Sequence, residues 1–270
     1  MSTTLFGDIK NTVKASAPRH LLGILASVYY LADGRWRLVW PSGDLFVVKT
    51  HQDTFYTCRE QIGRGGPEMR AHKYQRYQLP GFCSVGTGDF VIDVGSFIGE
   101  FSLPAAKTAD RVVAVEPDPV AFRALKKNTS SVNNIIPINS LISDTEKMYK
   151  FKSAADPTES SLINVDQGEY ETTSVYGHTI DSLVQNKISD IIPTQDQIDF
   201  IKIDAEGAEP EVLEGIKSTN VQKFAIDVGS ERRGESTEKK VDHILQERGY
   251  DTKTKEDKNG DTVLFANLNR

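Results

Sequence analysis

Short apolar runs rich in β-branched residues alternate, from Asp89 onward, with segments in which apolar residues recur every three or four positions. Strands and helices that take turns along the chain in this way are typical of a doubly wound parallel sheet. The predicted strands are 90–94, 111–116, 135–142, 198–204, 223–228, 250–256 and 262–268, with a further strand-like run at 148–151. The predicted helices are one of about eight residues after Gly99, one that begins at Pro119, and 179–186, 209–216 and 236–248.

The two last strand-like runs flank the dipeptide Asn259-Gly260. Asn-Gly between two such runs strongly indicates a hairpin turn, so these strands should be antiparallel to each other. The sequence therefore predicts an α/β fold with a sheet of about seven strands, which is parallel except for a C-terminal hairpin. The polar stretch over 153–161 is expected to form a flexible loop.

The first 84 residues differ from the rest in charge. They hold 11 Lys and Arg against 6 Asp and Glu, whereas the remainder holds 21 against 32. We expect a basic, partly helical N-terminal extension or lid over 1–84 and one main domain over 85–270. Within the extension, residues 21–32 are mostly apolar at helical spacing. This pattern fits a packed lid, a dimer element of a homodimer or a membrane-surface contact, of which ordinary packing is favoured.

Composition bears on whether the protein crosses a membrane and in which cellular compartment it is expected. No apolar run approaches the roughly 18 to 20 residues that span a bilayer, so no transmembrane segment is expected. The charged leader before residue 21 is long and no cleavage site of small residues follows, which disfavours a secretion signal. Cys58 and Cys83 are the only cysteines, and two isolated thiols suit the reducing cytoplasm.

Nucleic-acid binding would have to depend on the basic N-terminal segment, because an acidic main domain repels phosphate backbones. A solvated structural arm is the favoured interpretation of this segment. Its basic and aromatic residues include His51, Phe55, Tyr56, Arg59 and Arg64.

A glycine-flanked turn follows the strand 90–94. Asp93 lies in this strand, and Gly95 and Gly99 are separated by three residues. Glycine lets a ligand approach the backbone closely, and the amides of the following helix can hold polar groups. The spacing lacks the Gly-x-Gly-x-x-Gly pattern of dinucleotide-binding proteins.

Glu116 ends the next predicted strand, 23 residues after Asp93. A carboxylate at this point can accept both hydroxyl groups of a ribose. The glycine turn and Glu116 together therefore predict one ligand that contains adenosine.

A second acidic segment ends the strand 198–204. It runs from Ile201 to Glu209 and contains Asp204, Glu206 and Gly207. The carboxyl ends of parallel strands face the ligand crevice, so Asp204 and Glu206 should point toward the ligand. Glu209 begins the next helix, where a capping role is as plausible as a functional one.

Together these segments resemble the FkbM family of S-adenosylmethionine-dependent methyltransferases. The family carries Asp-x-Gly at the end of a strand and a later Lys-x-Asp-x-Glu-Gly-x-Glu, with Val-Glu-Pro at 115–117 and Thr-Ile-Asp-Ser-Leu at 179–183 between them in this chain. The resemblance covers about residues 66–255 and implies the class I methyltransferase fold, whose seven-stranded sheet ends in a reversed strand. One departure is that Ser96 and Phe97 stand where the family usually has Ala-Asn.

The resemblance implies a cofactor site for S-adenosyl-L-methionine along the carboxyl edge of the sheet. The resemblance places the glycine turn around the methionine part of the cofactor, Glu116 at the ribose and Ser140 to Leu141 at the adenine. Glu68 corresponds to a family acidic residue that precedes the methyltransferase fold in the sequence. The implied cofactor-binding residues are Glu68, Asp93, Gly95, Ser96, Phe97, Gly99, Glu116, Pro117, Ser140, Leu141 and Asp204.

Methyl transfer to a hydroxyl group also requires a base for the hydroxyl proton. The candidates are Glu206, Asp204, His178 and Asp227, and the sequence does not rank them. His178 has the suitable intrinsic pKa, but a single histidine before a helix is more often structural. Three strand-end carboxylates do not establish a metal site, so no metal is predicted.

The reaction expected from this resemblance is O-methylation of a hydroxyl group on a small molecule or a glycan. Base N-methyltransferases typically have Asn or Asp followed by Pro-Pro-Tyr where this chain has Asp204 to Gly207. Two alternatives stay open. One is an RNA methyltransferase that uses the basic N-terminal arm. The other is a cofactor-binding or scaffold protein without catalysis, which is retained because Phe97 replaces the usual Asn.

Overall fold

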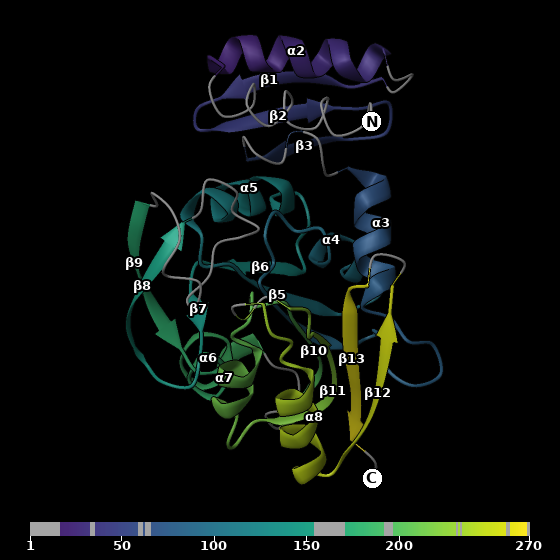
Figure 1. Cartoon of the computed structure of the whole chain (residues 1–270), viewed down its shortest axis with the longest axis vertical. Coiled ribbons are helices and arrows are strands. Elements are labelled where there is room, and N and C mark those ends of the chain that lie inside the picture. Colours follow the sequence, from purple (N-terminus) through teal and green to yellow (C-terminus); the bar gives the residue numbers. More distant parts are fainter. Residues whose placement is uncertain are drawn as a thin grey trace.

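The computed structural model describes residues 17–32, 36–58, 62, 66–153, 171–191, 197–230, 232, 234–257 and 260–268. Figure 1 shows a large central sheet with helices on both sides, a small curved sheet beside it, and an N-terminal layer at one end. The predicted flexible loop over 153–161 lies outside the described residues except for Ser153, and so does Asn259 of the predicted hairpin turn.

The central sheet has seven strands in the order β12-β13-β11-β10-β4-β5-β6. The strands β11, β10, β4, β5 and β6 are parallel to one another, whereas β13 pairs antiparallel with both β11 and β12. The predicted fold class and the C-terminal hairpin are therefore confirmed. The strands are β4 Phe90–Val94, β5 Arg111–Val115, β6 Ile135–Ile138, β10 Gln197–Ile203, β11 Asn220–Asp227, β12 Tyr250–Glu256 and β13 Thr262–Leu268.

The helices of the main domain connect the parallel strands. The start of α5 is as predicted, since the Asp118 carboxylate accepts hydrogen bonds from the amides of Val120 and Ala121, and Pro119 is the first helical residue. The helices are α4 Ser102–Ala105, α5 Pro119–Thr129, α6 Ile180–Lys187, α7 Glu209–Glu214 and α8 Glu238–Glu247, with a short 3-10 turn η2 at Ser189–Ile191.

Two predicted elements were wrong in extent. The helix after Gly99 has four residues instead of about eight, because the backbone stays in the turn up to Phe101. The predicted strand 135–142 is two strands, because the Asn139 amide donates to the carbonyls of Glu116 and Pro117 where the chain leaves the central sheet. Leu141 and Ile142 then form β7, in a different sheet.

That second sheet has the order β7-β9-β8. Strand β8 spans Lys147–Ser153 and contains the predicted strand-like run, whereas β9 at Glu171–His178 was not predicted. β7 Leu141–Ile142 pairs in parallel with the end of β9, at Gly177 and His178. The predicted adenine side, Ser140 to Leu141, therefore lies where the chain passes from β6 of the central sheet into the small sheet.

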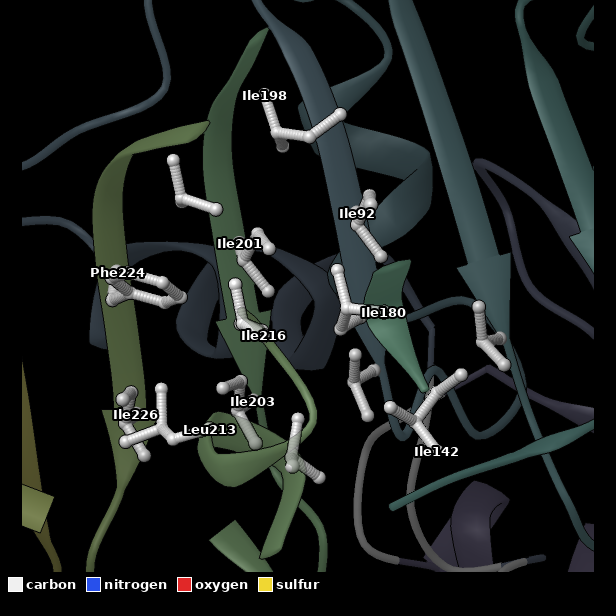
Figure 2. Packing of buried hydrophobic residues seen from close by; sticks show 14 of the residues in the cluster. Ile92, Ile142, Ile180, Ile198, Ile201, Ile203, Leu213, Ile216, Phe224 and Ile226 are labelled. Atoms are coloured by element: carbon white, nitrogen blue, oxygen red, sulfur yellow. The ribbon is translucent and has the colours of Figure 1, made fainter. Parts of the chain in front are cut away.

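The core fills both faces of the central sheet. On one face, side chains from alternate strand positions pack against α6, α7 and α8; Figure 2 shows Ile92, Ile201, Ile203 and Phe224 from the strands with Ile180 and Leu213 from the helices. On the other face, Val91, Val112 and Phe200 pack with Tyr77 and Phe101. This two-sided burial is why the inner strands are continuously apolar.

The first part of the chain forms a layer that the sequence pattern only partly predicted. Helix α2 at Arg19–Ala32 covers one face of a three-stranded antiparallel sheet of β1 Leu38–Ser42, β2 Leu45–Lys49 and β3 Thr54–Thr57. Helix α3 at Pro67–Arg76 then leads to the main domain. Figure 1 shows α2, this sheet and α5 stacked in that order. The described residues contain no helix of the length and hydropathy needed to cross a membrane.

The N-terminal sheet is attached to α5 by polar contacts. The Asn128 side chain accepts from the Tyr56 amide and donates to the carbonyls of Tyr56 and Ile98. Arg123 forms an ion pair with Asp44, and the Lys127 ammonium lies 4.5 Å from the centre of the Tyr56 ring. These contacts fix the N-terminal layer above the glycine turn.

Candidate functional site

The glycine turn after β4 is held tightly against the neighbouring strands. Gly95 has φ of 72° and Gly99 has φ of 93°. The amides of Gly95 and Ser96 both donate to the Val115 carbonyl at 3.0 Å. A Cβ at Gly95 would lie 1.9 Å from the carbonyl oxygen of Asp204, so glycine is required here by the close approach of the two strand ends.

Phe97 occupies the position of the usual family Asn, and its backbone explains the family preference. Its φ is 50°, in the left-handed region that non-glycine residues rarely adopt and that Asn tolerates better than Phe. The ring is half-buried and packs in a cluster with Leu45 and Tyr56 of the N-terminal sheet and with Val120 of α5. Phe97 therefore joins the turn to the N-terminal layer, a contact that Asn would not provide.

Glu116 lies directly after β5 and faces this turn. One carboxylate oxygen accepts from the Phe97 amide at 2.7 Å and the other from the Asp118 amide at 2.8 Å. The side chain is buried, and burial raises the pKa of Glu116 to about 8, against the effect of the Asp118 and Phe97 amides. Each carboxylate oxygen has more than one acceptor position, so these bonds leave capacity for two ribose hydroxyls.

The residues expected at the adenine and in the turn are mostly engaged with the backbone. The Ser140 hydroxyl donates to the carbonyls of Leu141 and Tyr176, and the Leu141 side chain is buried against Val175. The Ser96 hydroxyl donates to the carbonyls of Asp93 and Val115. Pro117, half-buried, lies between Glu116 and Asp118. These residues could therefore contact the cofactor through their main-chain atoms and through the shape of the surface that they form.

Lys202 lies near the carboxyl end of β10 and is buried between two acidic residues. Its ammonium is 3.1 Å from Asp93 Oδ1 and 3.6 Å from Asp204 Oδ2. It also donates to the carbonyls of Val94 and Gly95, at 3.2 and 2.6 Å. Burial alone would lower the pKa of Lys202, but Asp93 and Asp204 raise it above its ordinary value. Lys202 is therefore a buried cation that ties the glycine turn to β10.

The Asp93 carboxylate points into the protein. Its side chain is fully buried, and Oδ2 accepts a hydrogen bond of 2.5 Å from the Ser102 hydroxyl. Together with the Lys202 contact, this places Asp93 underneath the turn. Asp93 is therefore a buried residue that stabilises the glycine turn through Ser102 and Lys202.

Asp204 and Asp227, at the ends of β10 and β11, are brought together by Tyr77. The Tyr77 hydroxyl is 2.8 Å from Asp204 Oδ2 and 3.2 Å from Asp227 Oδ2. The Arg76 guanidinium is 2.6 Å from Asp227 Oδ2, and the Lys73 ammonium is 4.0 Å from Asp204 Oδ2. Helix α3 and the residue after it thus supply a phenol and two cations to the carboxyl edge of the sheet.

The two aspartates differ in charge state. Burial favours the neutral form of both, but the cations, above all Lys202, lower the pKa of Asp204 to about 2. Burial and then the nearby charge of Asp204 raise the pKa of Asp227 to about 6. Asp204 is therefore the ionised member of the pair, and Asp227 takes up a proton in mildly acidic solution.

Glu206 lies on the loop between β10 and α7 in a left-handed conformation. Its φ is 51°, Gly207 follows with φ of 94°, and the Glu206 side chain is half-buried. Glu209 holds this loop, since its Oε1 accepts from the amides of Ala205 and Gly207 at 3.1 and 2.9 Å, and its Oε2 accepts from the Thr237 hydroxyl. Of the two roles considered for Glu209, the structure supports the structural one.

Replacing Glu209 by glutamine tests this role through pH. Burial raises the pKa of Glu209 from 4.5 to about 7. Its contribution to stability is thus complete below about pH 4.5 and is lost as pH rises through 7. Glutamine keeps both acceptor bonds at Oε1, so the stability of Glu209→Gln relative to wild type should increase by about 1 to 3 kcal/mol between pH 5 and pH 8. Urea unfolding at both pH values measures this, and a difference independent of pH contradicts it.

His178 and Glu68 have no hydrogen bond or ion pair with the aspartate pair. His178 ends β9 in the small sheet, where Nδ1 is 3.2 Å from Glu146 Oε1 and 3.3 Å from the Ser182 hydroxyl. Glu68 is exposed in the first turn of α3. The structure therefore collects Asp204 and Asp227 into one network and leaves His178 in another.

A pocket of about 160 Å³ opens beside this network, between α3 and the hairpin of β12 and β13. Arg76 lines it and also binds Asp227, so the pocket adjoins the carboxyl edge of the sheet. The Arg76 Nε is buried and makes no hydrogen bond within the described part of the chain. The pocket-lining residues are His72, Gln75, Arg76, Lys255, Asp257, Asp261 and Val263.

Within the described ranges, no group of three or more His, Cys, Asp or Glu side chains has the geometry to hold a metal ion. Asp204 and Asp227 are instead neutralised by Lys202 and Arg76. The contacts that the structure shows for these carboxylates are with cations of the protein itself.

The sequence analysis did not assign a role to Lys202, Tyr77, Arg76 or Lys73. Lys202 had a signal, because a charged residue between Ile201 and Ile203 in a strand covered on both faces must be buried and paired. The other three come from helix α3, outside the sheet, and from the residue that follows it. Nothing in their spacing indicates that α3 packs over the ends of β10 and β11.

A family model and a relative that match this chain are both of methyltransferases. The family described as "Methyltransferase FkbM domain" matches residues 93–252. The methyltransferase sdnD of Sordaria araneosa is 24% identical over 212 residues, which cover 67% of this chain and 78% of that protein.

Solved structures, of which two are described here, are also similar to this chain. Methyltransferase FkbM from Methylobacillus flagellatus KT has a TM-score of 0.47 and 20% identity over 72% of this chain and 50% of its own. A SAM-dependent methyltransferase from Aquifex aeolicus has a TM-score of 0.44 and 14% identity over 74% of this chain and 89% of its own. The chain thus spans half the length of the Methylobacillus protein in that structure.

Proposed function

Because this chain belongs to the FkbM methyltransferase family, we propose that it transfers a methyl group from S-adenosylmethionine to a hydroxyl group of a small molecule or a glycan. Family membership confirms the resemblance and the cofactor that the motifs predicted. The observation that carries the proposal is the juxtaposition, at one edge of the sheet, of the Glu116 carboxylate beside the glycine turn and the Asp204 network.

Glu116 is the proposed ribose-binding residue. Its two oxygens are fixed by the Phe97 and Asp118 amides, so the carboxylate is already oriented before a ligand arrives. The same amide of Phe97 links ribose binding to the conformation of the glycine turn. We assign the surroundings of the methionine part to the backbone of Gly95 to Gly99, with Asp204 as an ionised carboxylate that complements a positive ligand.

The sulfonium of the bound cofactor supplies the methyl group, and the chain's residues have to align the acceptor with it and exclude water. The acceptor has to lie in line with the bond that breaks, and this requires a rigid binding site. Lys202 provides that rigidity, because it holds two carbonyls of the turn and two carboxylates at once.

Glu206 is the proposed general base for the acceptor hydroxyl. Asp204, with a pKa near 2, is too weak a base at neutral pH, and Asp227 is 2% exposed and bound to Arg76. His178 belongs to the network of the small sheet. Glu206 is half-buried on a loop next to Asp204, so the acceptor can reach it.

The pocket between α3 and the hairpin favours a hydroxylated acceptor. It presents donors from Arg76, Lys255 and Gln75 and acceptors from Asp257 and Asp261. A neutral polyhydroxylated ligand can use both kinds of group, whereas a strongly charged ligand would face like charge on one side.

A panel of acceptors with radiolabelled S-adenosylmethionine tests the proposed reaction. Label should be transferred to neutral hydroxylated compounds, such as sugars, and the product should resist treatments that cleave methyl esters. Transfer to RNA instead would replace the proposed function by the RNA alternative. Cofactor binding without transfer to any acceptor would support a non-catalytic protein.

A further inference from the structure

The glycine turn after β4 contains one bulky residue in a strained backbone conformation. Phe97 has φ of 50°, which is an outlier for a side chain of this size. The conformation of Phe97 matters for the site, because its amide donates to Glu116 Oε2 at 2.7 Å. A strained residue keeps its conformation only where the surrounding structure holds it. The contacts around Phe97 therefore bear on the orientation of Glu116.

The Phe97 ring packs against a buried apolar cluster that joins three parts of the chain. Two members belong to the N-terminal layer, Leu45 in β2 and Cys58 directly after β3. The others belong to the turn itself and to α5, which contributes only alanines. Outside the turn, Leu45 is thus the largest of the buried members, and it is fully buried. The cluster consists of Leu45, Cys58, Ile98, Ala121 and Ala124.

Hydrogen bonds of Asn128 connect the N-terminal sheet and the turn as well. Its Oδ1 accepts from the Tyr56 amide at 2.7 Å, and its Nδ2 donates to the carbonyls of Tyr56 and Ile98 at 3.0 and 2.9 Å. One side chain of α5 therefore fixes strand β3 and the residue after Phe97 together. Figure 1 shows the N-terminal sheet stacked on α5. The position of this sheet and the conformation of the turn thus depend on each other.

We propose that the N-terminal sheet positions the cofactor turn, with Leu45 as a positioning residue that keeps Phe97 in its left-handed conformation and the Phe97 amide on Glu116. The inference rests on the proposed role of Glu116 at the ribose. Without Leu45 the cluster loosens, Phe97 leaves the strained conformation, and its amide turns away from Glu116. The Glu116 carboxylate is then no longer oriented before the ligand arrives. Docking of the N-terminal sheet and binding of S-adenosylmethionine are therefore coupled, and such coupling is reciprocal.

A double-mutant cycle tests this role by titration calorimetry with S-adenosylmethionine. Leu45→Ala should raise the dissociation constant about tenfold in the wild-type background. Asn tolerates the left-handed conformation better than Phe, so Phe97→Asn makes the turn independent of the cluster. In the Phe97→Asn background, Leu45→Ala should therefore change the dissociation constant less than about twofold. A merely structural role of Leu45 would raise it by the same factor in both backgrounds.

Val48→Ala is the matched control for Leu45→Ala. Val48 is also fully buried in β2, but it packs with Leu22 and Phe46 in the cluster between the N-terminal sheet and α2. The control removes apolar volume from the same sheet without changing the cluster around Phe97. It should bind S-adenosylmethionine like wild type. Circular dichroism and thermal unfolding check that each variant is folded.

Hydrogen exchange of the wild-type chain tests the reciprocal effect and does not depend on whether Leu45→Ala folds. Saturating S-adenosylmethionine should slow the exchange of amides in β2 and β3 at least about fivefold, because the occupied site stabilises the docked sheet. The slowing should be smaller in Phe97→Asn, in which the ring contact with the cluster is lost.

Four outcomes overturn the positioning role. They are an equal effect of Leu45→Ala in both backgrounds, an equally weakened Val48→Ala, unchanged exchange in β2 and β3, and a folded Phe97→Asn without affinity for S-adenosylmethionine. If wild type binds S-adenosylmethionine saturably and Glu116→Ala does not, any of these results contradicts the positioning role alone. A folded wild type without affinity contradicts the proposed function and this inference together.

Discussion

Lys202→Met is expected to lower the free energy of unfolding by about 3 to 5 kcal/mol, because it leaves Asp93 and Asp204 without the cation between them. The carbonyls of Val94 and Gly95 lose a donor as well. Urea unfolding followed by circular dichroism measures the loss. Adding Asp93→Asn should recover part of it, since the double variant buries one charge fewer.

Lys223→Met is the matched control for this prediction. Lys223 lies on the adjacent strand β11 and pairs with Asp89 at 2.8 Å, but its side chain is 17% exposed against 4% for Lys202. Its loss should cost about 1 kcal/mol, because water can replace the partner. Equal losses of unfolding free energy in the two variants would contradict the claim that Lys202 is needed as a buried cation between Asp93 and Asp204.

Glu206→Gln is expected to lower turnover on a verified acceptor by roughly 10²- to 10⁴-fold. Glutamine keeps the size of the side chain but cannot take the hydroxyl proton. Because Glu206→Gln leaves Lys202, Asp204 and Tyr77 in place, the dissociation constant for S-adenosylmethionine should stay nearly unchanged. Asp204→Ala should show the opposite pattern, with weaker cofactor binding.

Both constants, measured in both variants, separate the two roles. If Glu206→Gln methylates the acceptor at the wild-type rate, the general-base assignment is wrong. Asp227 and His178 are then the next candidates. Between them, Asp227 has a pKa of about 6 and lies beside Asp204, whereas His178 lies in the small sheet.

The central sheet was predictable because burial on both faces leaves a direct signal in the sequence. Val91 and Ile92 point to opposite faces and both are buried, so the strand reads as an unbroken apolar run. The start of α5 was predictable from Asp118 and Pro119, whose local chemistry is the same in any fold.

The N-terminal sheet was not predictable by the same means. Its strands are four or five residues long and include Pro41, and Trp40 is exposed where an apolar residue suggests burial. β9 contains Gly177, a residue that disfavours a strand, and the close contact of Gly177 with Tyr149 appears only once β8 and β9 pair. Such strands are defined by their partners more than by their own pattern.

In the candidate site, too, some residues have a local signal in the sequence and others are placed only by packing. The placement of Glu116, Asp204 and Asp227 at one edge of the sheet could be predicted because the carboxyl ends of parallel strands share an edge. Tyr77 and Arg76 were missed because their position depends on how α3 packs, which no local pattern encodes. The strained φ of Phe97 also has no local signal, since Phe is an unusual residue for that conformation.

Titration calorimetry of the wild-type chain with S-adenosylmethionine tests the central claim most directly, with Glu116→Ala as the variant and the exposed Glu247→Ala as its control. We predict saturable binding to wild type and to the control, and a loss of about 2 to 4 kcal/mol of binding free energy in Glu116→Ala, because two ribose hydroxyls lose the acceptor that the Phe97 and Asp118 amides hold in place. A folded wild-type chain without affinity for S-adenosylmethionine at millimolar concentration would contradict the proposed function.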